Sequence, residues 1–234
     1  MAARTRRAER REEPLSRERI VGAAIELLDA AGEGGLTFRA LAARLATGPG
    51  AIYWHVTGKD ELLGAATDAV VADAMAAGTA DATPQEAIRA LALGVFDAIE
   101  AHPWIGTHIA RAPAQSPMLR VFEHIGRQIQ ALGVPHAARF TAASALLNYI
   151  LGMGGQNAAE ARTHQAHLPD TSRTEFLDTV SAAWKELDPD EFAFIRTIAD
   201  QLRDHDDRTE FLAGIDLILT GIVAGLEPAD RAGS

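Results

Sequence analysis

The chain has 234 residues and a formal net charge of −10, with 47% hydrophobic and 23% charged side chains. This composition is typical of a globular domain and excludes a collagenous or largely disordered chain. No apolar run approaches the ~20 residues of a membrane-spanning helix, and no apolar stretch follows the Arg-rich beginning, so we expect neither a membrane segment nor a secretory signal. The lack of cysteine excludes disulfides and thiolate metal sites and suits a cytoplasmic location.

Charge is distributed unevenly along the chain. Residues 1–63 carry ten basic and nine acidic side chains, whereas residues 64–234 carry twelve and twenty-three. Seven of the arginines lie within residues 1–19. A basic tip on an acidic body favours binding to a polyanion in one orientation. A disordered, solvated tail over residues 1–15 explains the same tip equally well.

The apolar residues recur at spacings of three and four, which predicts an all-α fold. Ser16 is placed to cap a first helix that ends near Gly32. Thr37 then caps a short helix, and Gly48 breaks the chain. A second short helix begins at Pro49, a residue favoured in the first helical turn.

The remainder of the chain shows further helix start and stop signals. We expect a helix from Lys59 past Met75, a loop over 78–82, a helix from the capping box Thr83–Glu86 to about His102, a short helix between Pro103 and Pro113, a helix from Ser116 to near Gly133, a long helix from Pro135 to about Ala161, a loop over 164–172, a helix starting at Asp188, and a last helix capped by Asp207 with Glu210.

Two short helices joined by a tight Gly-containing turn, after a longer helix, are typical of a helix-turn-helix. In that motif the first short helix braces the DNA backbone and the second lies in the major groove. Here Ile52 can face the core while Tyr53, Trp54 and His55 face outward. Seen in isolation, aromatic residues such as Tyr53 and Trp54 more often pack in a core or an interface. Their position in the second short helix of a helix-turn-helix favours DNA contact instead.

Two segments carry a resemblance to a known family. Residues 35–42, Gly-Leu-Thr-Phe-Arg-Ala-Leu-Ala, resemble the bracing helix of the TetR family of regulators. Residues 49–63, which contain Tyr-Trp-His-Val, resemble its recognition helix and the start of its fourth helix, and are especially similar to the tetracycline-repressor branch. Residues 206–216 resemble the closing helix of that branch. The resemblance implies a three-helix head over residues 16–63 and a larger ligand-binding and dimerisation domain over residues 64–228.

The resemblance also implies individual DNA contacts. Arg39 would reach a base edge or a phosphate, and Trp54 would pack near the groove wall. Tyr53, His55 and Lys59 would bind backbone phosphates.

The remaining DNA-contact candidates lie at the beginnings of the two short helices. Thr37, as an N-cap, would present backbone N–H groups to a phosphate. Pro49, Gly50 and Ala51 carry no side chain that can hydrogen-bond a base. We therefore expect sequence readout from Arg39, from apolar contact with thymine methyl groups, and from DNA shape.

The resemblance implies that the second domain holds an inducer between its middle helices and pairs two chains through its last long helices. The helix from Pro135 is rich in small residues, as a close helix–helix contact requires. We expect the last helix to expose its apolar residues to a four-helix dimer seam, with an ordinary buried core helix as the alternative. These residues are Phe211, Ile215, Ile218, Leu219 and Ile222.

Candidate ligand-binding residues are polar or aromatic groups set within apolar stretches, because small-molecule pockets have apolar walls and few polar anchors. Asn148 is the first choice, since a buried amide is costly without a partner. The histidine pairs lack the four-residue spacing of helical metal ligands, so we expect no metal and no cofactor. The candidates are His102, Trp104, His108, Met118, Phe122, Asn148, Tyr149, Met153, Gln156, Asn157 and Trp184.

Together these features predict a homodimeric repressor that binds palindromic double-stranded operator DNA and is released by a small-molecule inducer. Inducer binding would move the helix from Lys59 to Met75 and change the distance between two recognition helices, which must lie ~34–36 Å apart. A regulator without an inducer, controlled by a protein partner, is the alternative. An α-helical enzyme with an incidental helix-turn-helix is disfavoured, because the sequence has no serine elbow and no phosphate-binding glycine loop.

Overall fold

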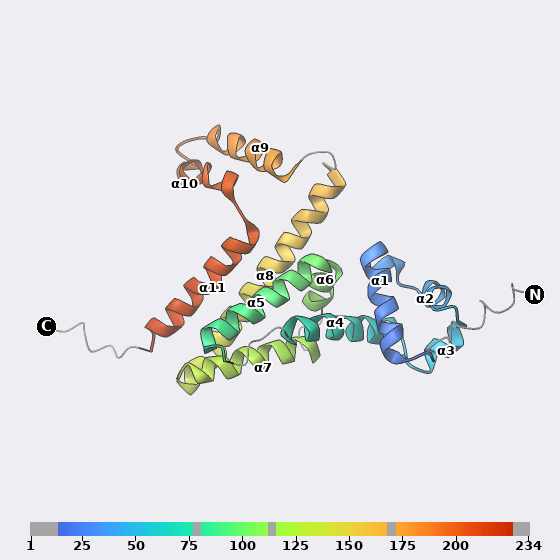
Figure 1. Cartoon of the computed structure of the whole chain (residues 1–234). Coiled ribbons are helices and arrows are strands. Elements are labelled where there is room, and N and C mark those ends of the chain that lie inside the picture. Colours follow the sequence, from blue (N-terminus) through green and yellow to red (C-terminus); the bar gives the residue numbers. More distant parts are fainter. Residues whose placement is uncertain (1–13, 77–80, 112–115, 168–171, 227–234) are drawn as a thin grey trace, which may run out of the picture.

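The computed structural model describes residues 14–76, 81–111, 116–167 and 172–226. These residues form helices and connecting turns without any strand, which confirms the all-α prediction. The helices, shown in Figure 1, are α1 (Arg17–Gly35), α2 (Phe38–Arg44), α3 (Pro49–Tyr53), α4 (Lys59–Ala76), α5 (Pro84–Ala101), α6 (Trp104–Arg111), α7 (Ser116–Ala131), α8 (His136–His167), α9 (Arg173–Lys185), α10 (Ala193–Ile198), the 3-10 turn η1 (Gln201–Asp204) and α11 (Asp207–Ala224).

The first three helices and the start of α4 form a small unit, which we call the head (residues 16–63). The Ser16 hydroxyl accepts a hydrogen bond from the Arg19 N–H at 3.3 Å, and the Thr37 hydroxyl accepts one from the Ala40 N–H at 3.1 Å, so both predicted N-caps are confirmed. Gly32 has φ +62°, a left-handed conformation that favours glycine and interrupts α1 near its predicted end.

The remaining described residues, apart from the arm defined below, form the body. Figure 1 shows α4 running from the head into the body, where it packs against α5 and α7. The core is built from fully buried aliphatic side chains of α5, α7 and α8, among them Val95, Ile125 and Ile150. The predicted capping box of α5 is confirmed, because the Thr83 and Glu86 side chains each bond the other residue's backbone N–H.

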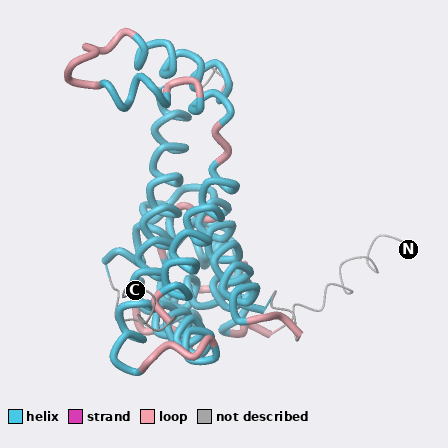
Figure 2. Tube along the Cα trace, turned by 90° about the vertical axis from the view of Figure 1, so that its left-hand side faces the viewer, coloured by secondary structure: helices cyan, strands magenta, loops and turns pink. Residues whose placement is uncertain are grey.

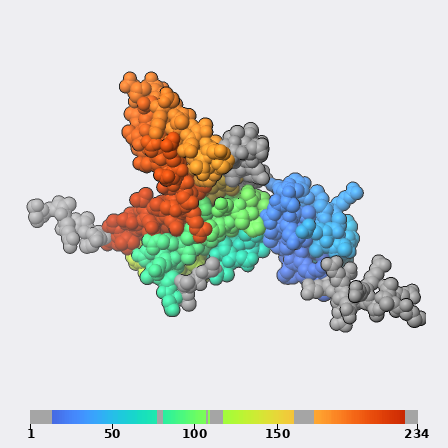
Figure 3. Space-filling view, turned by 45° about the horizontal axis from the view of Figure 1, so that its top comes forward, coloured from blue at the N-terminus to red at the C-terminus, as the bar shows by residue number. Residues whose placement is uncertain are grey.

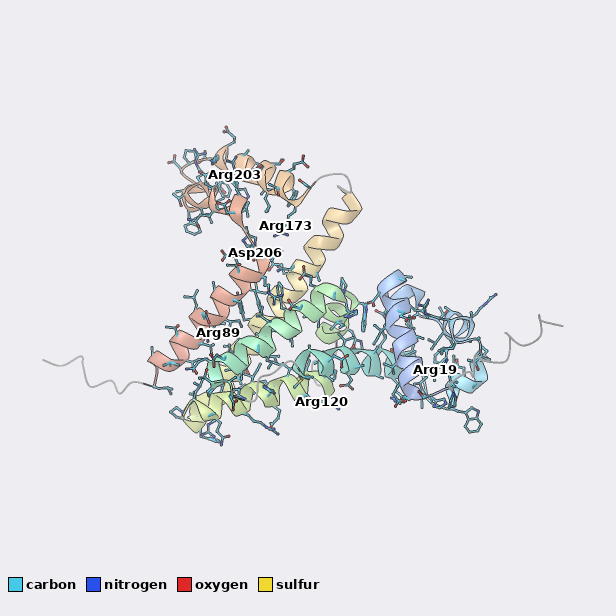
Figure 4. All side chains as sticks on the ribbon, in the orientation of Figure 1. Arg19, Arg89, Arg120, Arg173, Arg203 and Asp206 are labelled. Atoms are coloured by element: carbon cyan, nitrogen blue, oxygen red, sulfur yellow. The ribbon has the colours of Figure 1, made fainter. Side chains whose placement is uncertain are left out.

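Residues 172–205, which we call the arm, project away from the body (Figures 1 and 2). The space-filling view shows the arm as a separate lobe at the top of the molecule, whereas the head projects at the right (Figure 3). The arm has a small core, in which the buried Ser181 hydroxyl donates to the Ala199 carbonyl at 2.7 Å. Its base is tied to α11 by the Arg173–Asp207 ion pair at 2.7 Å, near the labelled Arg173 and Asp206 of Figure 4.

Residues 164–192 contain three differences from the predicted elements. Helix α9 was not expected, although Ser172 and Glu175 form a capping box that signals its start. Helix α8 continues to His167, so the predicted loop is wrong for residues 164–167. The helix predicted from Asp188 begins only at Ala193, because the Asp188 carboxylate accepts two backbone N–H bonds and forms a turn instead.

Helix α11 differs from the prediction in its cap and in its exposed face. The cap is Asp206 rather than Asp207, since the Asp206 carboxylate accepts the Thr209 N–H at 2.8 Å. The expected exposure of Phe211, Ile215 and Leu219 is wrong. These residues, four apart, form one buried face against the body, and Ile218 and Ile222 are half-buried. The exposed apolar residues of this helix are Leu217 and Val223.

Candidate nucleic-acid interface and ligand site

The recognition helix α3 is held by one buried residue and exposes the next two. Ile52 is fully buried beneath the head, as expected. Tyr53 is 55% exposed, and its ring stacks on Phe38 of α2 with centroids 4.3 Å apart and planes 8° apart. Trp54 is 90% exposed. The stacked rings of Phe38 and Tyr53 therefore connect the two short helices, and the exposed Trp54 indole follows Tyr53 in the chain. Tyr53 and Trp54 are accessible to another molecule.

The other predicted contacts of the two short helices lie on the same unit. Thr37, Arg39, Pro49 and Gly50 are exposed, and Ala51 is half-buried. Pro49, Gly50 and Ala51 have no side chain that donates a hydrogen bond. Among these five residues, Arg39 therefore has the charged side chain that is available to a base or a phosphate.

His55 and Lys59 are half-buried, and the Lys59 side chain and the His55 backbone carbonyl are engaged within the head. The Lys59 ammonium donates to the Glu33 carbonyl at 2.5 Å, which ties the start of α4 to the end of α1. The His55 carbonyl accepts a hydrogen bond from the Arg17 guanidinium at 2.6 Å. Phosphate binding by Lys59 therefore competes with an internal hydrogen bond.

An exposed polar network in the head was missed by sequence reasoning. Arg17 also pairs with Glu61 at 2.8 Å, and the other oxygen of Glu61 accepts from the Thr57 hydroxyl and the Thr57 N–H at 2.6 and 2.7 Å. The hydrogen bonds from Thr57, helped by Arg17, lower the pKa of Glu61 to about 2. A Thr followed four residues later by a Glu at the start of a helix was the available signal, and this spacing is one residue longer than that of a capping box.

Two of the predicted ligand residues are engaged with the head instead. His102 Nδ1 lies 2.7 Å from Asp29 Oδ1, and the Trp104 indole N–H donates to the same oxygen at 2.8 Å. Asp29 lies on α1, so these side chains are part of the joint between head and body. Trp104 is buried in this joint, and the His102 and Trp104 rings meet edge to face with their centroids 6.0 Å apart.

Helices α4, α6 and α8 each contribute a buried polar atom that has no hydrogen-bond partner among the described residues. These atoms are Asp68 Oδ1 on α4, His108 Nε2 on α6 and Asn157 Nδ2 on α8. Helix α6 contacts both α4 and α8, so it lies between the other two. Asp68 was missed, although a carboxylate within the apolar stretch of α4 was a visible signal.

The remaining ligand candidates are dispersed. Met118 is buried, Phe122 packs edge-on against Phe140 at 6.0 Å, and Met153 is half-buried. Trp184 is half-buried in the arm, and Gln156 is exposed on α8.

Asn148 and Tyr149 lie side by side on α8 in different surroundings. Asn148 is exposed, so the prediction that it is a buried amide is wrong. The Tyr149 ring stacks on Phe211, and its hydroxyl donates to the Glu210 carbonyl at 3.5 Å. Burial, with a contribution from the Glu210 charge, raises the pKa of Tyr149.

The described ranges contain no cluster of three or more histidine, aspartate or glutamate side chains that could hold a metal ion. The side chains of His164 and His167 lie outside the described residues. No helix in the described part of the chain combines the length and apolar character that a bilayer crossing demands.

Comparison with known proteins agrees with this arrangement. The family model for "Bacterial regulatory proteins, tetR family" matches residues 20–66, and the model "Tetracyclin repressor-like, C-terminal domain" matches residues 78–226. A solved TetR-type transcriptional regulator of Streptomyces coelicolor is 62% identical, with a TM-score of 0.82, over 90% of this chain and 99% of its own.

Other relatives are more distant. The transcriptional repressor DrrR1 of Streptomyces coeruleorubidus is 30% identical over 155 residues, 64% of this chain and 57% of DrrR1. The chain spans less than two thirds of the length of the curated relatives that it matches. ActR of S. coelicolor, solved in complex with actinorhodin, shares the fold with a TM-score of 0.71 at 24% identity, over 91% of this chain and 99% of ActR. The chain therefore belongs to the TetR family of bacterial regulatory proteins, which are DNA-binding transcription regulators and not enzymes.

Proposed function

We propose that the chain is a homodimeric repressor that binds a palindromic operator through its heads and is released by a small-molecule inducer held between α4, α6 and α8. Residues 16–63 supply the DNA-binding unit, and residues 64–228 supply the sensor and the dimer seam. The observation that carries the sensor is the set of buried, unpartnered polar atoms on Asp68, His108 and Asn157. Inducer binding there would shift α4, which leads directly into the head.

The exposed surface of α2 and α3 supports DNA binding. Arg39 supplies charge, and Tyr53 and Trp54 supply polar-edged rings beside it. The relative DrrR1 is a repressor, which favours repression over activation. The negative net charge of the body repels DNA phosphates, which favours an orientation in which the head faces the duplex.

Operator binding is tested with a duplex selected by the wild-type dimer from a random-sequence pool, using fluorescence anisotropy at several salt concentrations. Arg39→Ala and Tyr53→Phe should weaken binding, because each removes a contact to DNA. Arg127→Ala is the matched control, since Arg127 is exposed on α7 and pairs with Glu123 of the same helix. A folded dimer that forms no sequence-selective complex at low salt would contradict the proposal.

The sensor rests on the energetic cost of buried polar groups. Leaving a buried donor or acceptor without a partner costs about 1–3 kcal/mol. Such groups are rare in native proteins, and a bound ligand is one way in which they gain a partner. An amide donor, an imidazole nitrogen and a carboxylate oxygen on neighbouring helices suit a ligand that carries both hydroxyl and carbonyl groups. ActR, solved in complex with actinorhodin, supports a small-molecule ligand in the same fold.

Stability measurements test the sensor without knowledge of the inducer. Asn157→Leu should raise the free energy of unfolding of the ligand-free protein, because it removes an unpartnered amide. Ser181→Ala is the matched control. It removes a buried hydroxyl that has a partner, so it should lower stability by ~1 kcal/mol. If Asn157→Leu destabilises the protein as much as Ser181→Ala does, the amide is a structural group and the sensor site is refuted.

The dimer seam is supported by the outward faces of α8 and α11. Leu217 is 75% exposed on α11, and Ala145 and Gly152 are exposed on α8, which allows close helix contact. A second candidate function, control by a protein partner, is favoured by the 72% exposure of Phe194 on the arm. Phe194→Ser would then abolish regulation while leaving operator binding intact in a reporter assay.

A further inference from the structure

In the described part of the chain, α4 and a contact between α1 and α6 join the head to the body. Helix α4 is continuous, begins in the head and ends in the body (Figure 1). A single helix leaves the head free to pivot when that helix bends or rotates. A second contact away from the helix axis removes that freedom, so the strength of the α1–α6 contact decides how firmly the head is oriented.

The α1–α6 contact is centred on one carboxylate. Asp29 Oδ1 lies 2.7 Å from His102 Nδ1 and 2.8 Å from the Trp104 indole nitrogen. An ionised carboxylate only accepts hydrogen bonds, so both ring nitrogens donate to it. Charge-assisted bonds of this kind are shorter and stronger than neutral ones. Trp104 is 7% exposed and the Asp29 side chain is 35% exposed, so the bond between them is partly shielded from water.

We propose that Asp29 is a positioning residue for operator binding, which locks the head to the body through His102 and Trp104 and so sets the separation of the two recognition helices in the dimer. The inference rests on the proposed binding of a dimer to a two-part operator. Recognition helices enter successive major grooves only at a separation of ~34–36 Å. A head that pivots freely would accept a wider range of half-site separations.

The contact of Asp29 with His102 and Trp104, which we call the latch, is connected to the proposed sensor through one helix, α6. Trp104 and His108 are four residues apart on α6, which places them one above the other on the same face. A ligand that hydrogen-bonds His108 therefore acts one turn away from the indole that holds Asp29. Release of Asp29 would free the head without any change in the DNA-contacting residues.

The experiment compares duplexes that differ only in the spacing between half-sites. The duplex selected by the wild-type dimer is lengthened by one and by two base pairs at its centre, and dissociation constants are measured by anisotropy. We expect the ratio of lengthened to selected dissociation constants to fall by about fivefold or more in Asp29→Ala, the lower end of coupling between sites. Asp97→Ala is the matched control, because it removes the ion pair with Arg208 inside the body and should keep the wild-type ratio.

A pair of His102 variants separates positioning from stability. His102→Asn keeps a donor at the δ position and should retain spacing discrimination, whereas His102→Leu should lose it. Because His102 is partly exposed, both variants test the proposal even if Asp29→Ala fails to fold. A simple loss of stability would weaken binding to all duplexes alike and leave the ratio unchanged.

Head mobility can also be measured without DNA. The chain has no cysteine, so one cysteine introduced at the exposed Ala43 of α2 labels each head once with a nitroxide. Electron–electron distance measurements on the labelled dimer should give a broader distribution after Asp29→Ala. Unchanged distributions and spacing ratios in Asp29→Ala and His102→Leu would overturn the latch. A wild-type protein that ignores half-site spacing would instead refute the two-part operator, and the latch's role with it.

Discussion

The crossing of α4 and α5 offers a quantitative test of how closely the body is packed. Gly94 lies on α5 where a Cβ atom would be 2.5 Å from the Ala74 carbonyl oxygen and 3.2 Å from its carbonyl carbon. Both atoms belong to the backbone of α4, so neither can rotate away. Gly94→Ala must therefore push α5 away from α4, the helix that connects the head to the body.

The expected magnitude follows from two opposing effects. Alanine is favoured over glycine inside a helix by about 0.8–1.0 kcal/mol. Overpacking a tightly packed contact costs about 1–3 kcal/mol. Gly126 of α7 serves as the matched control, since a Cβ there would meet no heavy atom within 4 Å and should experience only the favourable effect. The difference in the free energy of unfolding between the two variants is therefore about 1–3 kcal/mol.

Urea denaturation at one fixed protein concentration measures this difference, because the stability of the proposed dimer depends on protein concentration. Gly126→Ala should raise the midpoint, and Gly94→Ala should fall clearly below it. Equal midpoints for the two variants would refute the close approach of α4 and α5. Helical circular dichroism of both variants checks that each has retained its fold.

Other predictions address the head and the dimer seam. Ile52→Ala should destabilise the protein by about 2–5 kcal/mol, because it empties a fully buried site; a negligible change in thermal denaturation would contradict the burial. Hydrogen bonds from Thr57 lower the pKa of Glu61 from 4.5 to about 2. The contribution of the ionised Glu61 carboxylate to the free energy of unfolding is therefore complete above pH 4.5 and is lost as the pH falls toward 2. Glu61→Gln should flatten acid denaturation curves in that window, and an unchanged curve would argue against the network. Leu217→Lys should convert the dimer to monomers in sedimentation velocity, since it places a charge in the proposed seam; an intact dimer would exclude Leu217 from that seam.

Short-range signals in the sequence determined the recognition unit. The caps Ser16 and Thr37, the proline that opens α3 and the buried Ile52 act within one or two helical turns. Such interactions do not depend on the remainder of the chain, so the start of each helix and the outward face of α3 could be predicted. The same reasoning failed for α9, where the signal of Ser172 and Glu175 was present but not used.

Tertiary structure alone decided which polar groups meet. Asp29 and His102 are 73 residues apart, and no local pattern joins them. On α11, Leu217 is exposed and Phe211 is buried, and this difference likewise depends on which helices α11 packs against. Helix propensity and capping act over a few residues, whereas the partner of a buried side chain is set by how whole helices pack. For that reason the sequence determines the DNA-reading head by itself, and the joint that orients the head becomes visible only in the folded chain.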